Sequence, residues 1–215
     1  MPTISELKEK SEATAFASVL GKSTIDKNSV EYKAIEKAVE ILINNGYGII
    51  HGGYAGGAMS ASSDTANRII KEKELPKELN IGVPQKEHDG LWERVADASF
   101  IEATEDIYTR LKIVTSGDIA VVCPLGGDGT ELEETIVFHE NVVREGVKKY
   151  APERNSAEPI PLIFLQTPTG TNWKKILEAK FEYLDTSVKE LSAYKWLYFV
   201  DTLEEFEKLI IELKK

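Results

Sequence analysis

Residues 118–134 read DIAVVCPLGGDGTELEE, an apolar run followed by a glycine-rich turn and a segment that opens with acidic residues. The run 118–123 is almost continuously apolar, which is typical of a strand buried on both faces of a parallel sheet. After the turn we expect a helix from Thr130 to about Arg144. A strand, a glycine-rich turn and a helix form the repeating unit of α/β folds, in which ligands bind where such turns leave the sheet.

The same alternation extends in both directions from this segment. Short apolar runs predict further strands at 14–20, 47–51, 80–83, 98–102, 161–166 and 196–200. Amphipathic stretches predict helices at 58–73, 105–114, 173–183 and 203–213, and one more that Ser29 caps and that stops at 44–46. The chain is therefore expected to form an α/β, Rossmann-like fold of three layers with a mostly parallel central sheet. The polar segment 150–161 predicts a surface loop within one domain that covers 1–215, because the strand after it needs the same sheet.

Length and charge exclude several classes of protein. The chain has 215 residues, of which 42% are hydrophobic, enough for the core of one mid-sized domain. Its 26 Lys and Arg against 36 Asp and Glu give a net charge of −10, and we find no basic run, so we expect no binding to nucleic acid. No stretch approaches the roughly 18 apolar residues of a membrane span, and the first residues are charged where a signal peptide is apolar. We expect no membrane association and a cytoplasmic location.

The sequence shows no pattern of a metal site. Cys123 is the one cysteine, so neither a disulfide within the chain nor a zinc site built from cysteines can form, and we expect Cys123 to pack in the core. His51, His88 and His139 lie too far apart to show metal-ligand spacing, and we expect no metal or organic cofactor. His51 ends a predicted strand beside a glycine-rich segment, where a ligand contact and a hydrogen-bonded structural role are both open.

Two glycine-rich segments, GGYAGG at 52–57 and GGDGT at 126–130, each follow a predicted strand and precede a predicted helix. The first N–H groups of such a helix have no partner within the helix, and together with the helix dipole they attract a phosphate. Glycine also removes the Cβ that would keep the ligand away from the backbone. Neither segment is a Walker A motif or a GxGxxG motif. We expect the second segment to bind a phosphate, through Gly126, Gly127, Asp128, Gly129 and Thr130.

Charged residues flank the second glycine-rich segment. Arg110 lies on the predicted helix that precedes this strand, and arginine is the natural bidentate partner of a phosphate or a carboxylate. Acidic residues in a first helical turn complement the helix dipole, which accounts for Glu131 and Glu134. Glu133 lies one turn beyond Thr130 and can face a ligand bound there. Glu134 points about 100° away around the helix, so it is either a secondary polar contact or a surface residue.

The segment 105–134, EDIYTRLKIVTSGDIAVVCPLGGDGTELEE, resembles the part of the Lonely Guy (LOG) family that carries an arginine, a hydrophobic strand and a PGGxGTxxE turn. Segments 15–23 (AFASVLGKS), 49–62 (IIHGGYAGGAMSAS) and 80–84 (NIGVP) are similar to other parts of that family, so the resemblance spans about 13–200. LOG proteins are cytokinin-activating phosphoribohydrolases of the Rossmann-like superfamily often labelled lysine decarboxylase-like. The resemblance implies that Arg110 and Glu133 are catalytic. It also implies ligand contacts at Ser18, Gly52, Gly53, Gly56, Gly57 and Met59.

The activity that the resemblance implies is hydrolysis of the N-glycosidic bond of a nucleoside 5′-monophosphate, such as a cytokinin riboside monophosphate or AMP. The products are a free base and ribose 5-phosphate, and no cofactor is needed. Breaking this bond places positive charge on the ribose, which a carboxylate at Glu133 would stabilise. Arg110 would bind the ligand and keep Glu133 ionised.

The same superfamily includes proteins that carry the molybdenum cofactor or bind nucleotides without hydrolysing them. Leu125 stands where the LOG family has proline, and Asp128 puts a carboxylate beside the expected phosphate; both departures favour this alternative. LOG-like proteins also form homodimers through the helices around the second glycine-rich segment. The apolar residues expected to supply that surface here are Ile136, Val137, Val142 and Val143.

Overall fold

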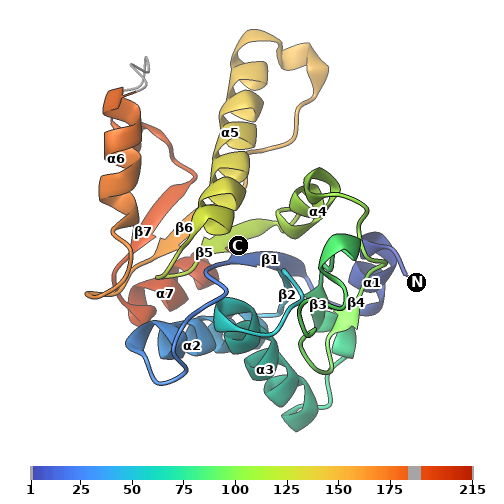
Figure 1. Ribbon diagram of the computed structural model, residues 1–215. Coiled ribbons are helices and arrows are strands. Elements are labelled where there is room, and N and C mark those ends of the chain that lie inside the picture. Colours follow the sequence, from blue (N-terminus) through green and yellow to red (C-terminus); the bar gives the residue numbers. More distant parts are fainter. Residues whose placement is uncertain (1, 184–189, 215) are drawn as a thin grey trace.

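The computed structural model describes residues 2–183 and 190–214. Its centre is one seven-stranded sheet with strand order β4-β3-β2-β1-β5-β6-β7, and every neighbouring pair is parallel (Figure 1). The α/β prediction is confirmed, with a sheet that is parallel throughout its described strands. These are β1 (Ala15–Leu20), β2 (Tyr47–His51), β3 (Asn80–Gly82), β4 (Ser99–Phe100), β5 (Ile119–Val122), β6 (Leu162–Leu165) and β7 (Leu197–Val200).

Helices cover both faces of the sheet and give the expected three layers (Figure 1). One face carries α2 (Val30–Asn44), α3 (Gly57–Glu72) and α7 (Leu203–Leu213), and the other carries α1 (Ile4–Lys10), α4 (Ile107–Val114), α5 (Asp128–Tyr150) and α6 (Trp173–Tyr183). Successive strand residues point to opposite faces, so Ile119 and Val121 of β5 pack in the first of these cores, whereas Ala120 and Val122 pack in the second. Burial on both faces explains why the run 118–123 is almost continuously apolar. Within the described residues, no helix combines the length and apolar character needed to cross a membrane.

Two elements differ from the sequence predictions. The helix after the second glycine-rich segment begins at Asp128 and not at Thr130, so three of the five residues expected to form the phosphate-binding turn belong to the helix itself. This helix also continues to Tyr150, because the first residue that cannot extend it is Pro152. The sequence analysis placed no element before residue 14, yet α1 forms there, with a capping box between Thr3 and Glu6.

The strand order reverses at β1. The chain moves outward from β1 through β2 and β3 to β4, and then returns to the other side of β1 as β5. In open parallel sheets, ligands bind outside the carboxyl ends of the strands at such a reversal. The strands that end there are β1 at Leu20, β2 at His51 and β5 at Val122, and the last two run into the two glycine-rich segments.

Candidate functional site

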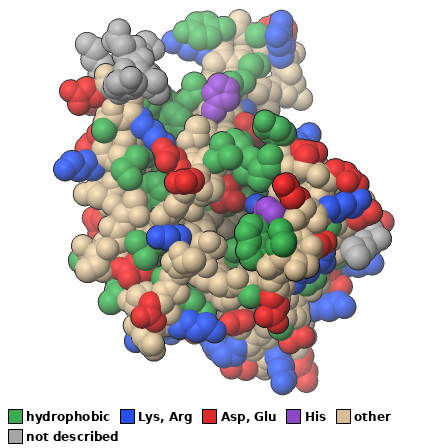
Figure 2. Space-filling model, in the orientation of Figure 1, with side chains coloured by type: hydrophobic (Ala, Val, Ile, Leu, Met, Phe, Trp, Pro, Cys, Tyr) green, Lys and Arg blue, Asp and Glu red, His purple; other side chains and the backbone are tan. Residues whose placement is uncertain are grey.

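A cavity of about 740 Å³ opens at the carboxyl ends of β1, β2 and β5. Figure 2 shows a hollow near the middle of this face, with acidic atoms inside it and hydrophobic and histidine side chains beside it. The structure brings together in its lining eight residues that the sequence singled out: Gly52, Met59, Arg110, Gly127, Asp128, Gly129, Thr130 and Glu133. Both glycine-rich segments therefore face one cavity. Arg110, which lies between them in the sequence, and Glu133, which follows the second, face the same cavity.

The N-terminus of α5 opens into this cavity. Gly127 is its N-cap residue and has no side chain with which to cap the helix. The N–H groups of the first turn have no partner within a helix, and at α5 they come from residues whose backbone faces the cavity. Asp128 and Gly129 are exposed and Thr130 is buried, so a ligand oxygen has access to this turn. The helix dipole adds to the attraction for a phosphate.

Gly126 shapes this turn without lining the cavity. A Cβ at this position would lie 2.2 Å from the ring of Trp173, so only glycine lets the turn pass under that ring. The indole N–H of Trp173 donates to the carbonyl of Cys123 at 3.0 Å, and the N–H of Gly126 donates to Oγ1 of Thr171 at 3.3 Å. The structure thus gives Gly126 a packing role at this turn.

The first glycine-rich segment contributes Gly52 and Met59 to the cavity, whereas Gly53, Gly56 and Gly57 lie behind its surface. Gly57 has a φ of +45°, and a Cβ there would lie 2.1 Å from the carbonyl oxygen of Lys22. The next N–H, that of Ala58, donates to the same oxygen at 2.9 Å. These glycines therefore allow the start of α3 to pack against the turn after β1.

Ser18 does not reach the cavity, contrary to expectation. It lies within β1 and is fully buried, and its Oγ accepts a hydrogen bond from the N–H of Gly117 at 2.9 Å. Successive strand residues point to opposite faces, so the neighbouring Val19 lines the cavity and Ser18 does not. The turn after β1 contributes Lys22, Ser23 and Thr24, of which Ser23 belongs to the segment 15–23 that resembles the LOG family.

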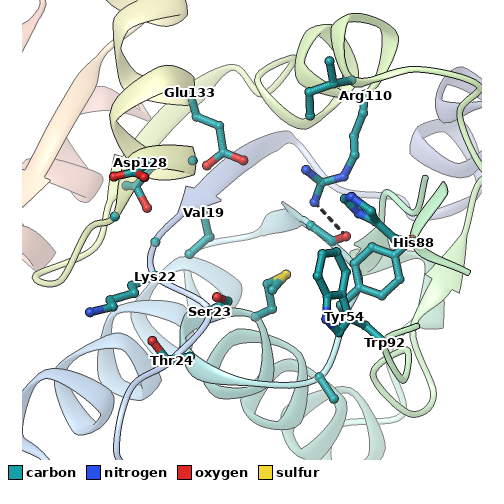
Figure 3. A pocket seen from close by; sticks show the side chains of 18 residues that line it. Val19, Lys22, Ser23, Thr24, Tyr54, His88, Trp92, Arg110, Asp128 and Glu133 are labelled. Carbon is teal, nitrogen blue, oxygen red and sulfur yellow. Dashed lines mark hydrogen bonds between the residues drawn. The ribbon is translucent and has the colours of Figure 1, made fainter. Parts of the chain in front are cut away.

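Arg110 is held in place by main-chain carbonyls. Its Nε donates to the carbonyl of Val83 and its Nη2 to the carbonyl of Gly52, both at 3.0 Å. The guanidinium group consequently projects from α4 into the cavity, and Glu133 projects into it from α5 (Figure 3). The two groups share the cavity, with the arginine already oriented by neutral partners and its charge directed to the ligand space.

Burial governs the protonation of Glu133. It raises the pKa of this carboxyl group to about 7, although the positive charge of Arg110 acts in the opposite direction. The sequence-based expectation that Arg110 keeps Glu133 ionised is therefore wrong in its net effect, because desolvation outweighs the charge. At neutral pH the carboxyl group lies near the midpoint of its titration, as is common for groups that exchange protons during catalysis.

His51 has a structural role, one of the two that the sequence left open. Its Nδ1 accepts a hydrogen bond from the N–H of Gly53 at 3.1 Å, so the proton lies on Nε2, which donates to Oδ1 of Asn80 at 2.9 Å. The side chain is fully buried, and burial lowers its pKa to about 4. A neutral His51 thus fixes the start of the first glycine-rich segment.

Three aromatic residues of the cavity were not predicted: Tyr54, His88 and Trp92. His88 had been considered only as a metal ligand, and burial together with the nearby charge of Arg110 lowers its pKa. The one signal in the sequence is a histidine and a tryptophan within the mostly polar segment 85–95. No spacing rule connects that segment to Tyr54, more than thirty residues earlier in the chain.

Glu134 is neither a ligand contact nor a surface residue. It is 1% exposed and accepts a hydrogen bond from Nζ of Lys180 at 2.7 Å. Lys180 also pairs with Glu131 at 3.1 Å, so these charges connect α5 to α6. Cys123 is buried as expected, and burial raises the pKa of its thiol. Among residues 2–183 and 190–214, no three His, Cys, Asp or Glu side chains lie together in a way that could hold a metal ion.

The fold is similar to that of two proteins connected with the molybdenum cofactor. The molybdenum cofactor binding protein of the phototrophic bacterium Rippkaea orientalis matches with a TM-score of 0.58 and 19% identity, over 93% of this chain and 97% of that chain. The molybdenum cofactor carrier protein of Chlamydomonas reinhardtii matches with a TM-score of 0.57 and 17% identity, over 92% and 96%. At these identities the likeness shows a shared fold, and this fold agrees with the Rossmann-like fold predicted from the sequence. No family model and no curated protein sequence matches the chain.

Proposed function

We propose that this protein hydrolyses the N-glycosidic bond of a nucleoside 5′-monophosphate. The observation that supports this proposal is that the N-terminus of α5, Arg110 and Glu133 all face one cavity. A phosphate-binding protein needs the first of these. A half-buried carboxyl group with a pKa of about 7 adds a group suited to proton transfer, which binding alone does not require.

The proposed reaction assigns one task to each group. The phosphate binds to the first turn of α5 and to the Thr130 hydroxyl, and Arg110 binds the ligand from the opposite side of the cavity. The bond between C1′ and the base nitrogen breaks with its electron pair on the nitrogen, which takes up a proton. Water adds to C1′ and loses a proton, which the carboxylate of Glu133 can accept. The same carboxylate stabilises the positive charge that forms on the ribose ring.

A second candidate is a protein that binds a phosphorylated ligand without cleaving it. Two observations favour it: the fold is shared with a molybdenum cofactor carrier protein, and Asp128 places a carboxylate at the first turn of α5. In this role the helix N-terminus and Arg110 would hold a phosphate, and Glu133 would have no chemical task. The two candidates differ in a single measurable property, the release of free base.

The deciding experiment measures base release from a panel of nucleoside monophosphates, including AMP and a cytokinin riboside monophosphate. We expect turnover of at least one, and we expect Arg110→Ala to lower kcat/KM about 10²–10³-fold because a charge preoriented in a dehydrated site is lost. Arg68→Ala, on the exposed face of α3, is the matched control and should retain activity. Thermal stabilisation by a phosphorylated ligand without any release of base would support the carrier instead.

We also propose that the protein is a homodimer that associates through α5. The expected surface needs correction, because Val137 is 2% exposed within the core and Val142 packs against that core. The large apolar side chains exposed on α5 include Leu132 and Val143, at 46% and 47%. We expect a dimer in size-exclusion chromatography with light scattering, and a monomer for the double substitution of both residues by Glu. Ile211→Glu on α7, equally exposed, should leave the dimer intact, and a monomeric parent protein would contradict the proposal.

A further inference from the structure

Three aromatic rings form a cluster at one side of the cavity. The ring centroids of His88 and Trp92 are 4.3 Å apart, and Tyr54 lies 5.6 Å from His88 and 6.0 Å from Trp92. All three pairs are edge-to-face, with interplanar angles of 65° to 71°. In an edge-to-face pair the edge of one ring meets one face of the other, so a ring that is exposed to the cavity keeps its second face free for a flat ligand ring.

Trp92 is exposed although large aromatic side chains are usually buried. It is 54% exposed, whereas the other two tryptophans, Trp173 and Trp196, are 2% and 5% exposed. Tyr54 beneath it is fixed by its hydroxyl group, which accepts from the N–H of Gln85 at 2.7 Å and donates to the carbonyl of Gln85 at 2.8 Å. The cluster thus has a rigid base and one accessible indole.

The segment 85–95, which we call the aromatic arm, is held in a defined position. Nη2 of Arg94 donates to both carboxylate oxygens of Asp89 at 2.8 Å, which closes the arm on itself. The N–H of Ala55 donates to the carbonyl of Glu93 at 2.7 Å, and the N–H of Val95 donates to the carbonyl of Gly53 at 3.1 Å. Because these bonds attach the arm to the first glycine-rich segment, the exposed indole is preoriented before any ligand arrives.

The aromatic arm and the first turn of α5 lie at opposite sides of the same cavity. In Figure 3, Asp128 and Lys22 lie on one side, the three rings and Arg110 lie on the other, and Glu133 lies between them. A ligand with a phosphate at one end and a flat ring at the other would place its middle near Glu133. The bond that the proposed function breaks joins the ribose to the base, which is that middle part.

We propose that the aromatic arm is the binding site for a planar heteroaromatic ring, which stacks on Trp92 with its edge toward Tyr54 and His88. The location of the phosphate at the other end rests on the proposed function. The chemistry that the arm recognises is a flat, nitrogen-containing ring system, which a purine nucleotide and a phosphorylated pterin share. Stacking depends on the flat ring and not on its substituents. The arm is therefore expected to distinguish ligands with such a ring from ligands without one, but not one base from another.

The test compares probes with and without the ring. We expect the parent protein to bind AMP or neopterin monophosphate at least about tenfold more tightly than ribose 5-phosphate, as one stacked ring contributes in other proteins. Trp92→Leu should remove about tenfold from the affinity for the ring-bearing probe and leave ribose 5-phosphate unchanged. Leu91→Ala is the matched control, since Leu91 is 72% exposed on the same arm and does not line the cavity.

Fluorescence gives an independent readout, because Trp92 is the accessible tryptophan of the three. A stacked ring should quench its emission and protect it from iodide. Trp92→Phe keeps a ring for stacking, so affinity should be retained while the quenching signal is lost. Thermal unfolding of each variant checks that the arm still folds.

The other possible outcomes overturn the proposal or separate it from the proposed function. Equal loss of affinity for ring-bearing probes and ribose 5-phosphate in Trp92→Leu overturns the proposal, and so does a parent protein that binds neither AMP nor neopterin monophosphate more tightly than ribose 5-phosphate. Ring-dependent binding without release of base supports the arm and contradicts the hydrolase. Preference for AMP or for neopterin monophosphate then tells which of the two ring systems the arm accepts.

Discussion

Replacing Glu133 by Gln is expected to lower kcat/KM for the nucleoside monophosphate substrate about 10³-fold while the fold is retained. Glutamine has nearly the same shape as glutamate but cannot become negatively charged or accept a proton from water. The positive charge on the ribose would then form in a cavity that Arg110 still lines with its positive charge, without the carboxylate that opposes it. The measurement is the rate of base release, quantified by chromatography at substrate concentrations below KM.

Glu131→Gln is the control for this substitution. Glu131 belongs to the same helical turn but lies outside the cavity and pairs with Lys180, so its loss should change the rate less than about twofold. The parent enzyme should also gain activity with rising pH until Glu133 is ionised, at a pH near 7 in the free protein. A Glu133→Gln enzyme that turned over its substrate at the full rate would show that this carboxylate takes no part in the reaction.

The sheet and the two glycine-rich segments were predictable because their signals are local. An apolar run followed by glycines and a polar helix specifies a strand, a turn and a helix without reference to distant residues. The parallel arrangement then brings the carboxyl ends of β1, β2 and β5 together, and with them Gly52, Gly127 and Glu133. Topology alone therefore places most of the site.

What sequence alone could not supply is the tertiary environment of each group. Ser18 and Ser23 both lie near the first turn, and only the structure shows that Ser23 lines the cavity whereas the Ser18 hydroxyl accepts a hydrogen bond from the N–H of Gly117 inside the sheet. The pKa of Glu133 depends on burial by several elements at once, and the charge pattern near it predicted the wrong direction. The aromatic arm is held at the cavity by main-chain hydrogen bonds. Such bonds do not depend on which side chains the residues carry, so the sequence does not reveal them.

The substitution of Glu133 by Gln is also expected to stabilise the protein at alkaline pH. The pKa of this carboxyl group is 4.5 when unperturbed and about 7 in the folded protein. Between these two values the unfolded chain has released the proton and the folded protein still holds it, so the free energy of unfolding falls as the pH rises through this window. By pH 8 the loss amounts to at most about 3 kcal/mol, and an uncharged glutamine avoids it. Thermal unfolding should therefore show a Tm for the variant about 5–10 °C above that of the parent protein at pH 8, and a smaller difference at pH 5.

The pH dependence separates this effect from ordinary changes in packing. A gain or loss of contacts at Glu133 would shift the Tm equally at pH 5 and pH 8, whereas removal of a buried charge acts only where that charge exists. Glu131→Gln should show no such difference, since Glu131 is exposed and paired. A variant that is no more stable than the parent at pH 8 would mean that Glu133 is already well solvated, and its use as a proton acceptor in a dehydrated cavity would lose its physical basis. Slower turnover together with higher stability at pH 8 is the result expected if the fold keeps a destabilising carboxylate for its chemistry.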